Sequence, residues 1–417
     1  GNGVDPVDII QQYGADALRF SVAQMATETQ DVRMPVLYKC PHCSELTPQT
    51  EKNMLLTRLD CSVCGKPMAT RWADESTQEE LGLALLTSDK FEIGRNFANK
   101  LWNASRFVLM NLDEGIPLTT PATLGERLSA DDLAPDDIWI LSHLSRAVSE
   151  TTRAIETYAF HDAAAGLYDF LWNYYCDWYV EAAKHDLYGD DAAARRRTQI
   201  VLACVLNTAV RLLHPVMPYI TEEIWRLLHE AVGAEMGSLL ITAPWPVDAA
   251  APGPSDTCAR VNAKYAIIRQ GRSLRSEFNI PPSAKARFTL KPGTPELAEF
   301  LVRETPRMAR FLMSDDITVD ADFTPPHPLP SHVGADAEIY LHLDGIDTDT
   351  ERARIRKQLE KHERYVASLT KKLSNEKFTS NAPAEVVQAE RDKLVEAEEK
   401  KERMTRTLLF LGGGAEE

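Results

Sequence analysis

The sequence RNFANKLWNASRFVLMNL, at residues 95–112, shows how the centre of this chain folds. Its apolar residues recur at helical spacing, which predicts an amphipathic helix over 91–110. The same kind of stripe returns at 136–158, 161–185, 192–213 and 218–231. Successive amphipathic helices joined by short breaks predict a mainly α chain with a helical bundle over residues 90–242.

A second face of the 91–110 helix carries amides and positive charge, from Asn99, Lys100, Asn103 and Arg106. Aromatic residues crowd this helix and the segment LWNYYCDWYVEAAK (171–184), and most of them are interpreted as bundle core. Trp178 fits a stacking role and a core role equally well. Amides and a guanidinium interleaved with aromatic rings suit single-stranded RNA loops, whose splayed bases are stacked and hydrogen-bonded on their edges.

The N-terminal stretch GNGVDPVDIIQQYGADALRF (1–20) predicts one helix over 5–25 that begins at Asp5 and Pro6. Residues 1–35 then lead into an insert and connector at 36–89. The insert contains two Cys-x2-Cys pairs separated by 17 residues, a spacing expected of a four-cysteine zinc ribbon. The predicted ligands of this metal site are Cys40, Cys43, Cys61 and Cys64.

Four thiolates fill a tetrahedral Zn²⁺ site and leave no position for a reacting water, so the expected metal is structural. Gly65 suits the tight turn after the second pair. His42 lies inside the first pair and is interpreted as an exposed filler rather than a ligand. The alternative is four free cysteines in chance order. The remaining cysteines, Cys176, Cys204 and Cys258, are interpreted as core.

The stretch APWPVDAAAPGPSD (243–256) reads as a linker, and a small α+β unit is expected over 257–345. It has a helix at 257–277, strand-like runs at 286–290 and 338–343, and a helix between them. The first helix carries a basic row, downstream of Lys264, that is either a solvated face or a phosphate contact. The members of this row are Arg269, Arg272 and Arg275.

Residues 346–417 are predicted to form an antiparallel coiled-coil hairpin, because heptad spacing runs along two segments of similar length around Pro383. In residues 351–377, nine Lys and Arg face four Glu, a local charge of +5 in a chain of net charge −16. The alternatives are an ordinary solvated coiled coil and a surface for a polyanion. The candidate backbone contacts are Arg354, Lys357, Lys361 and Arg364.

Composition narrows the class of protein. The chain has 417 residues, of which 44% are hydrophobic and 26% charged, which is typical of a globular protein without membrane spans. Cysteine pairs of the metal-binding kind favour a reducing compartment, so a cytoplasmic location is expected. No phosphate-binding loop, GxGxxG turn, GxSxG elbow or HExxH helix is present in the sequence, so no catalytic residue is predicted.

Several of these segments together resemble class I aminoacyl-tRNA synthetases. GNGVDPVDIIQQYGADALRF resembles the segment just after their KMSKS loop. RNFANKLWNASRFVLMNL, WNYYCDWYVEAAK (172–184) and LHPVMPYITEEIWRLL (213–228) are similar to the anticodon-binding helices of the valine-specific members. RSEFNIPPSAKA (275–286) and KLSNEKFTSNAPAEVVQAERDKL (372–394) are similar to the tail of those members. Only the cysteine insert falls outside the resemblance.

The resemblance implies a role for each part. Residues 1–35 would form the stem-contact helix at the end of the catalytic core, 90–242 would read the anticodon, and the hairpin would brace the outer corner of tRNA(Val). Related methionine enzymes use an Asn and an Arg near this point of the same helix, so Asn103 and Arg106 are the first candidates for anticodon contact, with Trp178 after them. The parent enzyme would attach valine to its tRNA with ATP and Mg²⁺.

The adenylate-forming and editing domains of such an enzyme are absent from this sequence. We therefore expect the later part of a longer chain, a monomer that is inactive by itself and works with the missing N-terminal catalytic part. Two alternatives remain at this stage. One is a stand-alone RNA-binding adaptor derived from a synthetase, and the other is a coiled-coil interaction protein with a zinc module. An upstream reading frame that encodes KMSKS would favour the enzyme.

Overall fold

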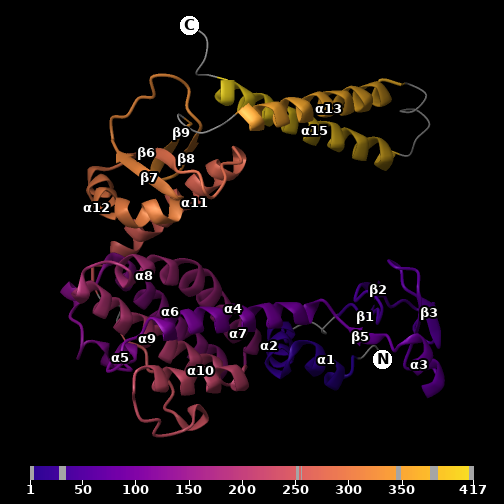
Figure 1. The fold of residues 1–417 in the computed structure, drawn as a ribbon, viewed down its shortest axis with the longest axis horizontal. Coiled ribbons are helices and arrows are strands. Elements are labelled where there is room, and N and C mark those ends of the chain that lie inside the picture. Colours follow the sequence, from indigo (N-terminus) through magenta and orange to yellow (C-terminus); the bar gives the residue numbers. More distant parts are fainter. Residues whose placement is uncertain are drawn as a thin grey trace. The chain divides into compact units, whose positions relative to one another are not determined.

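A computed structural model describes residues 4–27, 34–249, 253–254, 256–343, 349–375 and 384–412. The chain divides into two compact units, Gly1–Cys258 and Ala259–Glu417 (Figure 1). Within the described residues, no helix is long and apolar enough to cross a membrane. Helices predominate in both units, as predicted, and small sheets accompany them.

The first unit opens with two helices, α1 (Pro6–Tyr13) and α2 (Ala15–Met25), where the sequence predicted one. The break falls at Gly14, whose φ of 93° lies in the region that favours glycine. Asp5 caps α1 as expected, accepting a hydrogen bond from the Val7 amide at 2.8 Å. The sequence predicted one helix because its apolar residues keep helical spacing on both sides of Gly14. Such spacing does not reveal a single residue with positive φ.

The cysteine insert forms a small β module. Strands β1 (Leu37–Lys39), β2 (Leu46–Pro48) and β5 (Leu85–Thr87) make one antiparallel sheet in the order β2-β1-β5. β3 (Arg58–Asp60) and β4 (Pro67–Ala69) form a separate hairpin, and α3 (Glu75–Leu81) follows it. The module is joined to α1 by the Tyr13 and Thr87 hydroxyls, which are 2.9 Å apart.

The bundle contains the helices that the sequence predicted, at closely similar bounds. The long ones are α4 (Lys90–Met110), α6 (Pro135–Glu156), α9 (Ala192–Leu213) and α10 (Pro218–Ala231). The predicted helix at 161–185 is α7 (Phe160–Asp169) and α8 (Val180–Leu187) with a π-helical segment, Phe170–Tyr179, between them. Two short turns of helix, α5 (Pro121–Leu124) and η1 (Ala130–Asp132), connect α4 to α6.

Helix α2 is held against the bundle by two polar residues of the GADALR stretch. Asp16 caps α10, because its carboxylate accepts from the amides of Tyr219 and Ile220 at 3.2 and 2.6 Å. Arg19 donates to the carbonyl oxygens of Pro215 and Val216, at 2.8 and 3.1 Å. A Cβ on Gly94 of α4 would lie 2.5 Å from the Ala17 carbonyl oxygen, so this crossing of α2 and α4 requires glycine.

The predicted linker at 243–256 is only partly a linker. After η3 (Leu240–Thr242), the Trp245 indole donates to the Thr152 hydroxyl at 2.8 Å. Asp248 accepts hydrogen bonds from the hydroxyls of Ser145 and Ser149, also on α6. Residues 245–248 therefore pack along the bundle, and the boundary between the two units lies later, at Cys258 and Ala259. Proline-rich composition indicated irregular backbone but not whether that backbone was anchored.

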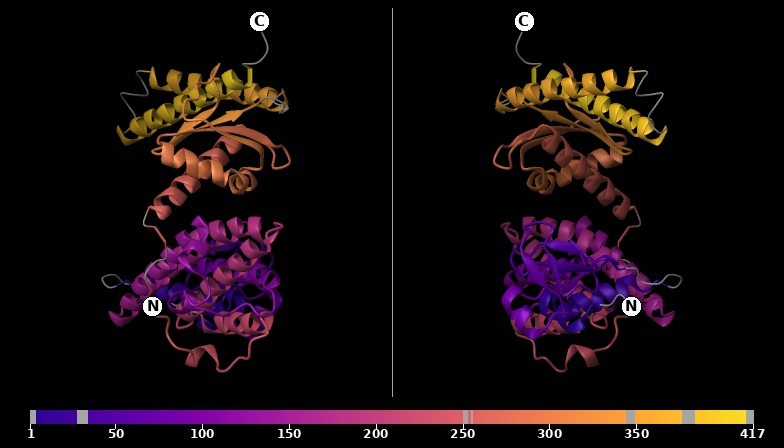
Figure 2. Two further views of the ribbon diagram at one scale, coloured as in Figure 1. Left: turned by 90° about the vertical axis from the view of Figure 1, so that its left-hand side faces the viewer. Right: turned by 90° about the vertical axis from the view of Figure 1, so that its right-hand side faces the viewer.

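The second unit contains α11 (Thr257–Glu277), except for its first two residues, and a four-stranded sheet in the order β7-β6-β9-β8. Its strands are β6 (Ala286–Pro292), β7 (Ser314–Val319), β8 (Ser331–Val333) and β9 (Ala337–His342). α12 (Pro295–Leu312) connects β6 to the parallel strand β7, and α11 and α12 lie on one face of the sheet (Figure 2). The Lys264–Glu304 ion pair, 2.9 Å long and almost fully buried, joins these two helices.

The chain ends in two long helices, α13 (Asp349–Leu373) and α15 (Ala384–Gly412). They lie side by side and run in opposite directions (Figure 1). Pro383, between them in the sequence, lies outside the described residues.

Candidate metal centre and nucleic-acid interface

The four predicted cysteine ligands converge at one point of the β module. The sulfur atoms of Cys40, Cys43, Cys61 and Cys64 all lie within 4.8 Å of one another. Two of the separations are 3.8 Å (Cys40 to Cys64) and 3.7 Å (Cys43 to Cys61). A tetrahedral zinc ion with Zn–S bonds of about 2.3 Å places its sulfurs about 3.8 Å apart, so the spacing fits Zn²⁺.

The two halves of this cluster are built alike. In each, the amide two residues after the first cysteine points at its sulfur, from His42 to Cys40 and from Val63 to Cys61, both at 3.4 Å. Each turn then closes through a residue with positive φ, which is Ser44 in the first (64°) and Gly65 in the second (69°). Amides directed at the sulfurs stabilise thiolates, as a metal site requires.

Electrostatics in the cluster favour a bound cation. The amides of Cys64 and Val63 lower the pKa of the Cys61 thiol to about 6. For Cys43, the Glu45 amide lowers the pKa, but desolvation and the neighbouring thiols outweigh it and raise the value to about 12. Four sulfurs this close cannot all carry negative charge unless a positive ion compensates them. His42 instead has its Nε2 2.9 Å from the Pro67 carbonyl oxygen, outside the ligand cluster.

The candidate anticodon contacts lie on α4 and the π-helical segment. Asn103 and Arg106 are both exposed on α4, while Trp178 is half-buried. Lys100, on the same polar face of α4, forms an ion pair with Asp177 and lies over the Trp172 ring at 4.3 Å. Lys100 therefore ties α4 to the π-helical segment, and the polar face is partly used in packing.

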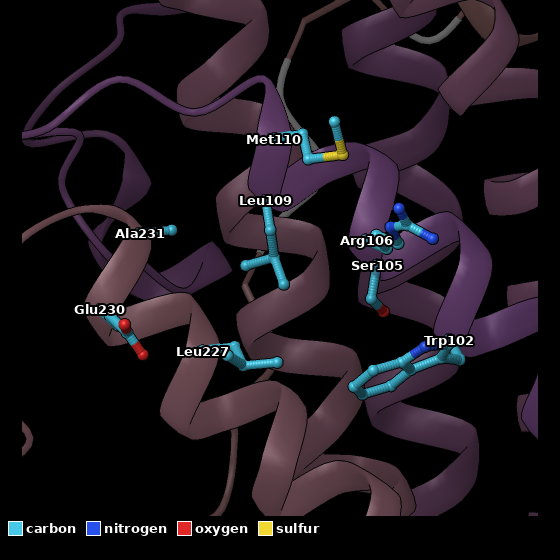
Figure 3. A pocket seen from close by; sticks show the side chains of 8 residues that line it. All are labelled: Trp102, Ser105, Arg106, Leu109, Met110, Leu227, Glu230 and Ala231. Carbon is cyan, nitrogen blue, oxygen red and sulfur yellow. The ribbon is translucent and has the colours of Figure 1, made fainter.

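A pocket opens beside Arg106, between α4 and α10 (Figure 3). Its volume is about 410 Å³ and most of its lining is apolar. From α4 it is lined by Trp102, Ser105, Arg106, Leu109 and Met110, and from α10 by Leu227, Glu230 and Ala231. Sequence reasoning missed this pocket. Trp102 and Arg106 were visible on α4, but no local signal indicated which part of α10 would lie opposite them.

The three arginines of the basic row of α11 differ in their exposure to solvent. Arg269 and Arg272 are exposed, and Arg272 also donates to the Phe311 carbonyl at 3.2 Å. Arg275 is buried, and its guanidinium donates to the carbonyls of Met313, Pro281 and Ala284 at 2.8–3.2 Å. Because these bonds occupy the Arg275 side chain within the fold, it is not placed for a phosphate. Helical spacing alone did not reveal the turn at 281–284 that covers it.

The four candidate residues of α13, Arg354, Lys357, Lys361 and Arg364, are all exposed. Arg364 is 4.0 Å from Glu360 on its own helix, and its side chain is 83% exposed. Ile355 and Leu369 are buried. The other cations of α13 include Lys372, which is 3.1 Å from Glu390 of α15. The helix therefore directs a narrow apolar seam inward and most of its positive charge to solvent.

Two protein families match parts of this chain. Residues 137–290 match the family described as the anticodon-binding domain of tRNA ligase, and residues 347–412 match the valyl tRNA synthetase tRNA binding arm. The chain therefore carries a match to an anticodon-binding domain of tRNA ligases, followed by a match to a tRNA-binding arm.

Individual relatives agree. The valine–tRNA ligase of Rhodopirellula baltica is 38% identical over 99% of this chain, and that of Geobacillus stearothermophilus is 34% identical over 99%. The enzyme of Enterococcus faecalis is 33% identical over 96%. The chain is therefore similar, over nearly its whole length, to one part of these valine–tRNA ligases. It spans about 40% of the length of the first two relatives and 38% of the third, and it corresponds to their C-terminal part.

Proposed function

We propose that this chain is the tRNA-binding part of an enzyme that attaches valine to tRNA(Val), with ATP and Mg²⁺ used by the rest of that enzyme. The observation that carries the proposal is the presence of two tRNA-contacting families in one chain, an anticodon-binding domain and an arm described for the valine enzyme. By itself the chain binds tRNA and does not activate valine. We further propose that it works as a monomer in the cytoplasm.

The two units divide the work. The bundle contacts the anticodon through Asn103 and Arg106 on exposed turns of α4, and through half-buried Trp178 of the π-helical segment as a stacking residue. The second unit contacts the sugar–phosphate backbone, through the exposed cations of α13 and through Arg269 and Arg272 of α11. Phosphate contacts position a nucleic acid, whereas base contacts specify it. Selectivity for tRNA(Val) therefore comes mainly from the bundle.

The proposed arm is a coiled-coil hairpin. Its support is the heptad spacing of the sequence, the antiparallel packing of α13 on α15 and the burial of Ile355 and Leu369 along one line of α13. Those two residues are 14 positions apart, two full heptads.

The module at 36–89 is proposed to be a zinc ribbon with one structural Zn²⁺ held by its four cysteines. The sulfur spacing and the paired turns support it. The core of the module is small and includes two of the ligands. Its members are Val36, Tyr38, Cys40, Leu59, Cys61, Met68, Ala84 and Leu86. A core of this size is expected to depend on the metal, because structural zinc contributes about 10–16 kcal/mol of apparent binding free energy.

Binding to tRNA is tested by anisotropy titration of the chain with a tRNA that carries the valine anticodon and one that does not. We expect Arg106→Ala to weaken the first complex by about 1–3 kcal/mol, the scale of a good base contact, and to leave the second nearly unchanged. Arg153→Ala, an exposed arginine of α6 outside the proposed site, serves as the control. Equal losses for both tRNAs would contradict anticodon contact by Arg106.

The zinc proposal is tested by elemental analysis of protein purified without chelator. About one zinc per chain is expected, and Cys43→Ser is expected to unfold residues 36–73 while the bundle keeps its helical signal. Cys204→Ser, in the core of α9, controls for loss of a buried thiol. A zinc content well below one would overturn the proposal.

The rival interpretations make different predictions. A coiled-coil interaction protein would associate through 350–410 and show no affinity for tRNA. A tRNA-binding chain that remains a monomer in sedimentation would exclude it. Valine-dependent pyrophosphate exchange by the pure chain would contradict the proposed absence of catalysis.

A further inference from the structure

The four clustered cysteines of the β module differ in how far solvent reaches them. Cys40 and Cys61, the first cysteine of each pair, are 1% and 3% exposed. Cys64 is exposed, and Cys43 is half-buried. Oxidation of a cysteine depends on its exposure and its thiolate character. Cys43 and Cys64 are therefore the two positions of the cluster that an oxidant in solution reaches first.

Each of these two accessible cysteines has a buried cysteine of the other pair beside it. The sulfur of Cys64 is 3.8 Å from that of Cys40, and the sulfur of Cys43 is 3.7 Å from that of Cys61. A disulfide bond is about 2.05 Å long, so the two sulfurs of each couple have to approach by less than about 2 Å. Redox-sensitive cysteines often stand next to a second cysteine that resolves the oxidised sulfur. The cluster contains two such couples, and each crosses between its two halves.

The buried member of each couple is prepared for the resolving step by the backbone. The amide of His42 points at the sulfur of Cys40, and the amide of Val63 points at the sulfur of Cys61, both at 3.4 Å. An amide directed at a sulfur favours its thiolate, which is the form that attacks an oxidised sulfur. The hydroxyl of Thr47, 4.0 Å from the Cys61 sulfur, acts in the same direction.

We propose that this cluster is an oxidative modification site for hydroperoxides, at which two disulfides, Cys40–Cys64 and Cys43–Cys61, replace the zinc ion. The inference rests on the zinc ribbon proposed above. Each disulfide joins the turn between β1 and β2 to the turn between β3 and β4, as the metal does. The oxidised module therefore loses its zinc but keeps its fold. Disulfides within each Cys-x2-Cys pair would leave the two halves unconnected.

The reaction has two steps at each couple of sulfurs. The accessible thiolate attacks one oxygen of hydrogen peroxide, the O–O bond breaks, and a sulfenic acid and a hydroxide form. The buried thiolate then attacks the sulfenic sulfur and expels a second hydroxide. Over both couples, four thiolates, two peroxides and four protons give two disulfides and four waters. Sulfur loses four electrons, peroxide oxygen gains them, and Zn²⁺ leaves with its oxidation state unchanged.

Keeping the fold of the module matters because the module supports the start of α1. Val4 packs against the core of the module. The hydroxyls of Tyr13 and Thr87 are 2.9 Å apart, and Arg71 lies 3.9 Å from Asp8 of α1. Loss of the module would remove all of these contacts. Crosslinking by disulfides preserves them when the metal leaves.

The test is a titration of the zinc-containing chain with hydrogen peroxide, in which a chromogenic chelator reports free zinc. We expect about one zinc to be released for every two peroxides, and the chain to become about 4 Da lighter than the reduced zinc-free chain. Peptide mapping without reduction should find the two disulfides between the halves, and dithiothreitol with added Zn²⁺ should reverse the change. Cys258→Ser, which removes a half-buried thiol outside the cluster, is the control and should release zinc at the same ratio.

Hydrogen exchange of residues 36–89 tests whether the oxidised module stays folded. We expect exchange at least about tenfold slower in the oxidised chain than in the reduced chain treated with chelator, because only the oxidised chain keeps its crosslinks. Equal exchange in the two overturns the inference. So do zinc retained under excess peroxide, disulfides within a Cys-x2-Cys pair, and oxygenated sulfurs in place of disulfides. These outcomes leave the zinc ribbon and tRNA binding standing, whereas a chain purified without zinc overturns the ribbon as well.

Discussion

Helices α9 and α13 are of similar length, 22 and 25 residues, but they differ in how many of their residues are buried. α9 buries fifteen of its residues and is surrounded by the bundle. Among the residues of α13 whose side chains are described, only Ile355 and Leu369 are buried. A helix that is apolar all round is a core element, whereas a narrow seam with charge elsewhere leaves a surface for a partner. Stability is therefore expected to reside in the bundle and backbone binding in the arm.

The largest expected difference is between two arginines. Arg197 of α9 lies 2.9 Å from Asp137 and 2.5 Å from Asp186, and both carboxylates are at least nine-tenths buried. Arg197→Met leaves these two charges without their partner, at a cost of about 3–5 kcal/mol in the free energy of unfolding. Arg364→Met on α13 should change it by less than about 0.5 kcal/mol. Urea unfolding followed by circular dichroism measures both, and equal midpoints would break the comparison.

Leucines test the same contrast through packing. Leu206→Ala in the fully buried part of α9 should cost about 2–5 kcal/mol, because it leaves a cavity that the bundle cannot close. Leu369→Ala removes the same atoms from the seam of a helix pair, where solvent and neighbouring side chains can fill the space. We expect a smaller loss there, confined to the arm. Hydrogen exchange resolves the two regions, and protection lost in the bundle of Leu369→Ala would contradict the expectation.

The arm should matter more for binding than for folding. Replacing Arg354, Lys357, Lys361 and Arg364 with Glu should weaken binding to valine and non-valine tRNAs alike, since phosphate contacts carry no sequence information. Each lost contact should also reduce the slope of log affinity against log salt by about one. Titrations at two salt concentrations check this. If the affinity for tRNA at low salt is unchanged, α13 is a solvated helix that does not contact tRNA.

The last contrast is a pH response of the bundle. Burial and the nearby Arg146 lower the pKa of His143 from 6.5 to about 4. Its Nδ1 accepts from Arg146 at 2.9 Å, and protonation would break that bond. The unfolded chain therefore takes up this proton first, and stability falls as the pH drops from about 6.5 to about 4. His143→Phe keeps a ring between Trp139 and Tyr174 and should flatten this part of the melting-temperature profile.

Local sequence pattern was sufficient to locate the long helices and the four cysteines that converge. Apolar spacing located α4, α6, α9 and α10 to within a residue or two, because side chains three and four positions apart share a helix face whatever the surroundings. The spacing of Cys40, Cys43, Cys61 and Cys64 identified four sulfurs that do converge, because each pair is closed by its own tight turn. The basic character of α13 was likewise a property of composition.

Other features depended on residues distant in the sequence. The Arg275 side chain is held inside the fold because it donates to the carbonyls of Met313, Pro281 and Ala284. Lys264 is buried in an ion pair with Glu304 of α12. Residue spacing predicts which side chains share a helix face. It does not predict which other element of the fold covers that face.

The sequence by itself indicated the resemblance to valine–tRNA ligases, the order of the long helices and the four cysteines whose sulfurs converge, because short-range patterns record each of them. Only the tertiary structure decided that Gly14 divides the first helix, that Arg275 is buried, and that the Ser105 hydroxyl has no hydrogen-bond partner among the described residues. The physical reason is the same in all three cases. Backbone angles at one residue, carbonyls of a distant turn and the crossing of α4 with α10 are set by packing across the fold, which no local periodicity records.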